Sequence, residues 1–151
     1  MAKPKITNYT WNDFDKDIDI LVKKIKDSKV NFNIICGIIR GGLPIATALS
    51  HKLKLPVETT LISLRDSKAR RDYWILDALD DNKTILFADD ICDSGATFSW
   101  ILGQYSIKKR NLLSQVKFAS LIQDNDAKTK ADFYGRLKEN KNWIKFPWEE
   151  K

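Results

Sequence analysis

The sequence predicts an α/β protein built on a doubly wound parallel sheet, and three observations support that prediction. Four short runs are rich in apolar residues, and one of them, Ile85–Ala88, is continuously apolar, as in parallel strands that are buried on both faces. These runs lie at about 32–39, 56–64, 84–88 and 116–122. Helical patterns near 43–54 and 97–109 alternate with the runs, which is typical of strand–helix–strand units. The 151 residues are 43% hydrophobic, which is enough to form the core of one domain over residues 1–151.

The first expected element is a helix that begins at Thr10. Thr10 and Asp13 have the spacing of a helix-capping residue and its partner in the first turn. An apolar stripe at helical spacing follows, and it consists of Phe14, Ile18, Leu21, Val22 and Ile25. The stripe indicates that this helix packs against one face of the sheet.

The first strand of the sheet ends in the turn Arg40-Gly41-Gly42, and Pro44 suits the first turn of the helix that follows. Two glycines let backbone amides approach an anion closely, and the Arg40 guanidinium matches the geometry of phosphate oxygens. Gly-Gly at a strand-to-helix corner is also ordinary turn chemistry. This turn alone therefore does not establish a phosphate site.

A run of charged residues, 65–72, follows the second strand. The run lies between the apolar residues 57–64 and the short segment 73–76. Charge runs of this kind predict an exposed, mobile loop.

The most informative segment is the third strand together with the residues after it. Asp89 and Asp90 come directly after the apolar strand Ile85–Ala88, at the edge where ligands bind in open α/β sheets. Two carboxylates there can accept hydrogen bonds from a vicinal diol such as ribose O2 and O3. Adjacent acids would repel each other unless a ligand or metal used them, which favours a functional role.

Small residues follow the acids and lead into the next helix. Asp93 comes first, and residues 94–97 then let backbone amides close around a phosphate at the helix start. Asp-Ser-Gly is also a common turn and helix cap, but that interpretation leaves the two preceding acids unexplained. The segment therefore predicts a sugar-phosphate site.

Two tryptophans, Trp143 and Trp148, lie near the carboxyl end. Each has a large apolar surface to bury, and core packing would satisfy that need. A flat indole also has the right shape to stack on a planar heterocycle.

The net charge of +6 comes from basic residues that are scattered among acids. This distribution favours a small polyanionic substrate over nucleic acid or a membrane surface. The sequence has no apolar stretch of membrane-span length, and its amino-terminal residues lack the apolar core of a secretion signal, so we expect a cytoplasmic protein. Cys36 and Cys92 lack metal-ligand spacing and are expected to be buried thiols.

Residues 85–97 resemble the phosphoribosyl-pyrophosphate signature of the type I phosphoribosyltransferases. The resemblance implies that Asp89 and Asp90 bind the ribose hydroxyls. It assigns the 5-phosphate to the turn formed by Asp93, Ser94, Gly95, Ala96 and Thr97. Together with Asp89 and Asp90, this turn would bind phosphoribosyl pyrophosphate. It further implies a Mg2+ cofactor with Asp89 as a metal-binding carboxylate, and Asp93 as the general base toward the nucleobase.

Two other loops resemble parts of the same family. Arg40-Gly41 resembles the pyrophosphate-binding loop, which implies a cis peptide bond between Ile39 and Arg40. In the family a flexible loop closes over pyrophosphate, and Arg71 best matches its basic residue. Arg70 and Lys68 stay open as alternatives for that role.

The carboxyl-terminal segment resembles the end of the bacterial xanthine-guanine phosphoribosyltransferases. In those proteins a Trp-Ile-x-x-Pro-Trp element forms part of a hood over the purine. By this match Trp143 stacks on the base, the backbone of Ile144 meets its edge, and Trp148 is structural. We therefore expect a core over about 10–122 and a hood over about 123–151.

One position departs from the family pattern. Purine members that accept 6-oxo bases carry a lysine just after the strand at 116–122, where it donates to the base O6, and the equivalent residue here is Asp124. A carboxylate accepts hydrogen bonds rather than donating them. Either Lys128 or Lys130 reaches back into the site, or the chain prefers a base with an exocyclic amine.

The resemblance implies a purine phosphoribosyltransferase of nucleotide salvage, which joins a nucleobase to C1 of phosphoribosyl pyrophosphate and releases pyrophosphate. It also implies a homo-oligomer, either a dimer or a tetramer. Two alternatives remain at this point. One is a regulator on the same fold that senses phosphoribosyl pyrophosphate or binds nucleic acid, and the other is a transferase for a non-purine acceptor.

Overall fold

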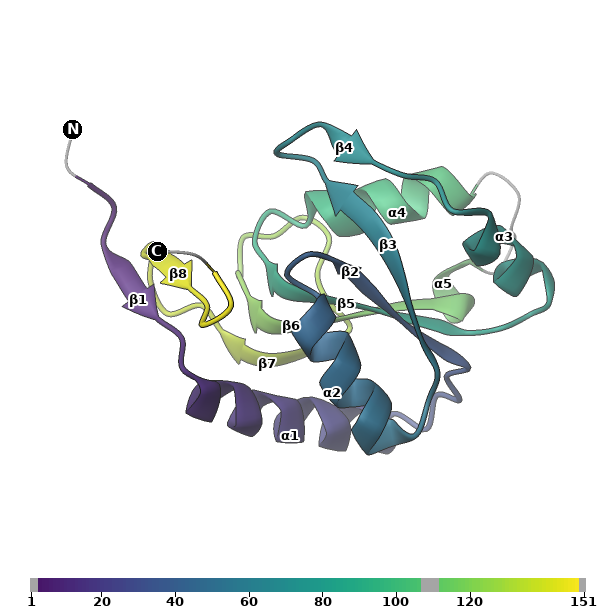
Figure 1. The fold of residues 1–151 in the computed structure, drawn as a ribbon, viewed down its shortest axis with the longest axis horizontal. Coiled ribbons are helices and arrows are strands. Elements are labelled where there is room, and N and C mark those ends of the chain that lie inside the picture. Colours follow the sequence, from purple (N-terminus) through teal and green to yellow (C-terminus); the bar gives the residue numbers. More distant parts are fainter. Residues whose placement is uncertain (1–2, 107–111, 150–151) are drawn as a thin grey trace.

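The computed structural model describes residues 3–106 and 112–149, and a central six-stranded sheet organises them (Figure 1). Its strands are β2 (Ile34–Ile39), β3 (Val57–Ser63), β4 (Lys68–Ala69), β5 (Ile85–Cys92), β6 (Val116–Gln123) and β7 (Phe133–Leu137). They lie in the order β4-β3-β2-β5-β6-β7. All neighbours are parallel except β3 and β4, so the predicted α/β fold with a mainly parallel sheet is confirmed.

Helices cover both faces of the sheet. α1 (Trp11–Asp27) and α2 (Leu43–Leu53) bury their apolar side chains in the core layer on one face. α3 (Tyr73–Asp80) and α4 (Ala96–Ser106) do the same on the other, and the short α5 (Leu112–Gln115) leads into β6. Within the described ranges, no helix combines the length and the hydropathy that crossing a membrane would require.

The first helix begins where the sequence predicts. The Thr10 hydroxyl accepts the N–H of Asp13 at 3.1 Å, and the Asp13 carboxylate accepts the N–H of Thr10 at 2.9 Å. This reciprocal cap satisfies two backbone donors that the first turn leaves without helical partners. The predicted stripe faces the sheet, with Ile18 and Leu21 fully buried.

A second, two-stranded sheet lies beside the main one, at the left of Figure 1. It pairs β1 (Ile6–Asn8) in parallel with β8 (Trp143–Lys145). After β8, the rings of Phe146 and Trp148 stack with their centroids 5.0 Å apart. These two rings pack on an aromatic cluster formed by Tyr9, Trp11 and Phe14. The carboxyl-terminal segment is therefore held against the start of α1.

The expected boundaries differ from the structure at the edges of the fold. β5 continues to Cys92, so Asp89 and Asp90 lie within this strand and not after it. β7, in the segment expected to form the hood, joins the main sheet, and α3 was not expected as a helix. The helix predicted at 97–109 corresponds to α4, and residues 107–109 of that prediction lie outside the described residues.

The physical reason for the missed strand is its place at the edge of the sheet. β7 contains Gly135 and Arg136 and is only partly buried, so it has no continuous apolar run. Its pairing with β6 is a long-range contact that periodicity along the chain does not report.

Candidate functional site

A cleft of about 430 Å³ lies at the carboxyl ends of β2 and β5. Its walls come from the turn between β2 and α2, the loop after β3, the end of β5 with the start of α4, and the segment around β8. The predicted site residues that line it are Arg40, Gly41, Asp89, Asp90, Asp93, Ser94, Ala96, Thr97, Trp143 and Ile144. The fold thus brings four separate sequence segments into one cleft.

Asp89 and Asp90 form a partly buried pair of carboxylates. Asp89 Oδ1 accepts the N–H of Asp90 at 2.9 Å, and Asp90 Oδ1 accepts the N–H of Ile91 at 2.8 Å. Burial, reinforced by the charge of Asp90, raises the pKa of Asp89 well above its ordinary value, and burial also raises the pKa of Asp90. Protonation of one carboxyl would relieve the repulsion between the two groups. A bound cation or sugar hydroxyls would relieve it with both groups ionised.

The turn after β2 approaches these acids from the neighbouring strand. The peptide bond between Ile39 and Arg40 is cis, as the family resemblance implied. Arg40 is exposed and lines the cleft together with Gly41. The turn therefore presents a guanidinium and backbone amides on the same side as the carboxylate pair.

Residues 94–97 form the turn into α4 and its first residues, and they line a smaller hollow of about 90 Å³ that adjoins the cleft. Gly95 has a φ of +81°, and a Cβ at this position would clash with the backbone oxygen of Thr129, so the turn requires glycine. Ser94 Oγ accepts the N–H of Ala96 at 3.2 Å. Because the first amides of a helix lack partners within it, the hollow suits an anion such as phosphate.

The charged loop after β3 reaches the cleft through an arginine that the sequence analysis did not single out. Arg65 lines the cleft, and its guanidinium lies over the Trp143 ring, 5.1 Å from the centroid. Arg71 is exposed and is not among the described residues that line the cleft, and Arg70 pairs with Asp72 at 2.8 Å. The only sequence signal for Arg65 was its place directly after the strand, at the start of the charged run.

The two carboxyl-terminal tryptophans occupy different environments. Trp143 is 46% exposed and lines the cleft, so its indole is accessible to a ligand. Trp148 is packed in the aromatic cluster behind the cleft. Trp143 is therefore placed where a ligand could contact it, whereas Trp148 packs against neighbouring aromatic rings.

Asp124 does not line the cleft. Its Oδ1 accepts the backbone N–H two residues along the chain at 2.8 Å, and this hydrogen bond lowers the pKa of the carboxyl. Lys128 and Lys130 are exposed and also lie outside the cleft lining. The lysine that does line the cleft is Lys138, which directly follows β7 and lies near Asp93. Sequence reasoning missed it because it did not recognise β7.

The donor set of the cleft fits a magnesium ion that arrives with a phosphorylated substrate. Among the described residues, no group of three or more His, Cys, Asp or Glu side chains could hold a metal. Mg2+ commonly binds one or two carboxylates and completes its shell with water and substrate phosphates. Asp89 and Asp90 offer such carboxylates, and because burial raises the pKa of both groups, a bound cation would favour their ionised form.

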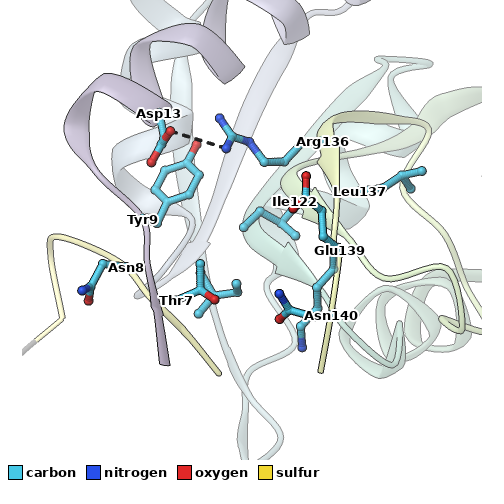
Figure 2. A pocket seen from close by; sticks show the side chains of 11 residues that line it. Thr7, Asn8, Tyr9, Asp13, Ile122, Arg136, Leu137, Glu139 and Asn140 are labelled. Atoms are coloured by element: carbon cyan, nitrogen blue, oxygen red, sulfur yellow. Dashed lines mark hydrogen bonds and ion pairs between the residues drawn. The ribbon is translucent and has the colours of Figure 1, made fainter. Parts of the chain in front are cut away.

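A second hollow, of about 110 Å³, lies between β1 and the end of β7 (Figure 2). Tyr9, Asp13 and Arg136 project toward one another in its wall. Arg136 Nε donates to the buried Asp17 Oδ2 at 2.8 Å, and the Tyr9 hydroxyl donates to the same oxygen at 2.6 Å. Burial and that hydrogen bond raise the pKa of the Tyr9 hydroxyl. Because Arg136 of β7 and Tyr9 both donate to Asp17 of α1, these hydrogen bonds hold the amino-terminal segment against β7.

Comparison with known proteins shows related sequences over almost the whole chain. The model of the phosphoribosyl transferase domain family matches residues 9–151. A xanthine-guanine phosphoribosyltransferase of Gluconobacter oxydans is 26% identical over 155 residues, which cover 97% of this chain and 88% of the relative.

Solved structures share the same fold. A purine phosphoribosyltransferase from Pyrococcus horikoshii has a TM-score of 0.74 and 26% identity, over 97% of this chain and 96% of its own. A hypothetical protein from Neisseria gonorrhoeae, solved with bound ppGpp, has a TM-score of 0.75 and 20% identity, over 99% of this chain and 92% of its own. At that identity, the second likeness shows the fold alone.

Proposed function

The chain belongs to the phosphoribosyl transferase domain family, and from this premise we propose that it transfers the 5-phosphoribosyl group of phosphoribosyl pyrophosphate to a purine base, releasing pyrophosphate. The observation that supports this most strongly is the convergence of four features in one cleft. These are the carboxylate pair, the amide hollow at the start of α4, the Arg40 turn and the exposed indole of Trp143.

The sugar phosphate is held in this proposal by the end of β5 and the start of α4. Asp89 and Asp90 accept hydrogen bonds from the two ribose hydroxyls, which requires both carboxylates to be ionised. The amides of residues 94–97 bind the 5-phosphate, with the dipole of α4 favouring the anion. These contacts fix the ribose ring so that C1 faces the remaining part of the cleft.

The leaving group and the base occupy opposite sides of C1. Arg40 and the amide of Gly41 bind pyrophosphate, and Arg71 is proposed to reach it from the loop after β3. Trp143 stacks on the base, and the backbone of Ile144 contacts its edge. Asp93, whose side chain is 67% exposed in the cleft, takes the proton that the base loses as its nitrogen bonds to C1.

Catalysis in such a site depends on positioning and electrostatics. Holding base, sugar and pyrophosphate in line converts the encounter of separate molecules into a reaction within one complex. Mg2+, when bound with the substrate, neutralises charge on the departing pyrophosphate. The protein residues supply the fixed donors and acceptors that match the charge developing between C1 and the leaving group.

A direct assay tests the proposal. Phosphoribosyl pyrophosphate and Mg2+ are supplied with adenine, guanine, hypoxanthine, xanthine or a pyrimidine in turn, and nucleotide formation is followed by chromatography. We expect nucleotide from at least one purine and none when Mg2+ is removed. Turnover with pyrimidines only would move the function to a non-purine acceptor.

Failure with every base would leave a protein that binds the sugar phosphate as a sensor. The structure favours catalysis over sensing because a sensor needs only the phosphate contacts. Asp93 and the exposed Trp143 also line this cleft, and they are the side chains proposed to act on the base.

A further inference from the structure

The loop between β6 and β7, residues 124–132, packs directly against the turn that leads into α4. A Cβ on Gly95 in this turn would overlap the carbonyl oxygen of Thr129 in the loop. The N–H of Lys128 donates to the carbonyl oxygen of Ser94 at 3.0 Å. Residues 94 and 95 line the small hollow proposed to hold the 5-phosphate, so the loop lies against the backbone that shapes this hollow.

Thr129 makes two further contacts with the same part of the fold. Its carbonyl oxygen accepts a hydrogen bond from Cys92 Sγ at 3.2 Å, and its hydroxyl shares a hydrogen bond with the hydroxyl of Ser99. Cys92 ends β5 and lines the hollow, and Ser99 lies in the first turn of α4. One loop residue therefore contacts the end of β5, the turn and the helix, which are the three segments that line the hollow.

A buried glutamine fixes the loop near both of its ends. Gln123 is 1% exposed and is the last residue of β6. Its Nε2 donates to the carbonyl oxygen of Asp124 at 2.7 Å, and its Oε1 accepts the N–H of Ala131 at 2.8 Å. Because a buried polar group that loses its partner costs free energy, this amide holds the loop in one conformation.

The turn needs such support because phosphate binding there depends on the direction of backbone amides. An amide donates well only when its N–H points at the acceptor. Gly95 is buried against Thr129, whereas its neighbours Ser94 and Ala96 are exposed. The loop is thus the surface against which the turn takes its shape, and a shift of the loop would turn the amides away from a bound phosphate.

We propose that Gln123 is a positioning residue for the sugar phosphate. It holds the loop between β6 and β7, and the loop holds the amides of residues 94–97 in the direction that the 5-phosphate requires. This inference rests on the proposed function, since it takes the hollow as the 5-phosphate site. Among the described residues, Gln123 lines neither the cleft nor the hollow, so its effect on binding must act through the loop.

The test replaces Gln123 with methionine, which has a similar length and no amide. Gln115→Met is the matched control, because Gln115 is a second buried glutamine, directly before β6. Its Nε2 donates to the carbonyl oxygens of Leu79 and Lys83 at 3.0 and 3.2 Å. Both substitutions remove a buried amide with two backbone partners, so both should lower the free energy of unfolding in urea. Only Gln123 lies beside the hollow, paired in register with Cys92 of β5.

Ribose 5-phosphate and pyrophosphate separate the two halves of the proposed substrate. Calorimetry with each ligand alone, in the presence of Mg2+, measures the turn before α4 and the Arg40 turn independently. We expect Gln123→Met to weaken ribose 5-phosphate binding by about tenfold or more, while pyrophosphate affinity stays within about twofold. Gln115→Met should leave both affinities within about twofold of the wild type.

Thr129→Val is a second variant, and it decides the question if Gln123→Met does not fold. It removes the hydroxyl shared with Ser99 and keeps the size of the side chain. We expect about two- to fivefold weaker ribose 5-phosphate binding and unchanged pyrophosphate binding. Equal weakening of both ligands would show a general loosening of the fold, and unchanged ribose 5-phosphate affinity would show that the loop does not position the turn. Either result overturns the inference.

The two proposals fail in different ways. A wild-type transferase whose ribose 5-phosphate affinity is unaffected by Gln123→Met would refute the positioning role alone. A wild-type protein that binds ribose 5-phosphate but forms nucleotide with no base would refute the transferase function, and the variants would still decide the role of Gln123. A wild-type protein that binds neither ribose 5-phosphate nor phosphoribosyl pyrophosphate would overturn both.

Discussion

Gly41 lies so close to Asp90 that a Cβ on Gly41 would overlap the Asp90 carboxylate. The two residues come from neighbouring strands, one in the turn after β2 and the other in β5. Their contact joins the loop proposed to bind pyrophosphate to the pair proposed to bind ribose. Any side chain at Gly41 must displace a carboxylate of the proposed sugar site.

Replacing Gly41 with alanine should therefore impair binding of phosphoribosyl pyrophosphate. We expect Gly41→Ala to weaken its affinity by about tenfold or more, because a close-packed site cannot absorb the extra methyl group without moving Asp90. Calorimetric titration in the presence of Mg2+ measures the effect. Gly103→Ala in α4 is the control, since a Cβ there meets nothing within 4 Å, and it should leave binding unchanged. Wild-type affinity in Gly41→Ala would refute the coupling of the two loops.

Much of the fold and of the candidate site could be predicted because their signals are local. The segments that became β2, β5 and β6 are mostly apolar, with a continuous apolar run at Ile85–Ala88, and the acids of β5 are followed within a few residues by the small residues of the turn before α4. Because this motif follows the apolar part of a strand along the chain, its position at the ligand-binding edge of a parallel sheet could also be predicted.

The residues that were missed depend on contacts between distant segments. Lys138 reaches the cleft only because β7 pairs with β6, and Arg65 only because its loop folds back over Trp143. β8 could not be assigned from its own three residues, because it is stabilised by pairing with β1 at the other end of the chain. Propensity and periodicity carry no information about such pairings.

The raised pKa of Asp89 predicts an unusual pH dependence of stability. Above the ordinary pKa of an aspartate, the folded protein keeps a proton that the unfolded chain has released. Since the folded state then binds more protons, the free energy of unfolding should fall as the pH rises toward the raised pKa. We expect Asp89→Asn to flatten this decline and to stabilise the unliganded protein at neutral pH, as measured by urea denaturation across pH.

The same substitution should weaken substrate binding, because a neutral amide lacks the negative charge that a carboxylate offers to Mg2+ and to the ribose hydroxyls. Binding of phosphoribosyl pyrophosphate should weaken by about tenfold or more in Asp89→Asn. A variant that is neither more stable nor weaker in binding would contradict the assignment of the acidic pair as a ligand site.

The proposed base, Asp93, should matter for turnover far more than for sugar-phosphate affinity. We expect Asp93→Asn to reduce kcat by about 10²- to 10⁴-fold, since the amide cannot take the proton of the base. Rapid-mixing turnover measurements and calorimetry with phosphoribosyl pyrophosphate separate the two effects. Equal losses of kcat and affinity would count against a general-base role.

The buried carboxylate of Asp17 predicts a strong structural effect far from the reacting atoms. It is 1% exposed and takes hydrogen bonds from Arg136 and Tyr9. We expect Arg136→Met to lower the free energy of unfolding by about 2–3 kcal/mol, because the buried charge loses its cationic partner. Lys23→Met, which breaks an exposed pair with Asp27, should leave the free energy of unfolding nearly unchanged. Similar losses in both variants, by urea denaturation, would refute a special role for Asp17.

Trp148 supplies the last prediction, because its indole N–H adjoins the sugar site from behind. Burial raises the pKa of Asp90, and the indole N–H of Trp148 opposes that rise. Within the described ranges this buried N–H has no hydrogen-bond partner of normal geometry, so it is available to strengthen its contact with an ionised Asp90. Trp148 would then position a ribose-binding carboxylate in addition to packing on Phe146.

Trp148→Phe separates these two roles, since phenylalanine can still stack on Phe146 but has no N–H. We expect affinity for phosphoribosyl pyrophosphate to fall by about three- to tenfold, and the acid limb of the pH profile of kcat/KM to move to higher pH. The upward direction follows because losing the donor lets the pKa of Asp90 rise further. Trp11→Phe, in the same aromatic cluster, is the control and should leave the pH profile in place. An identical profile in both variants would show that Trp148 serves packing alone.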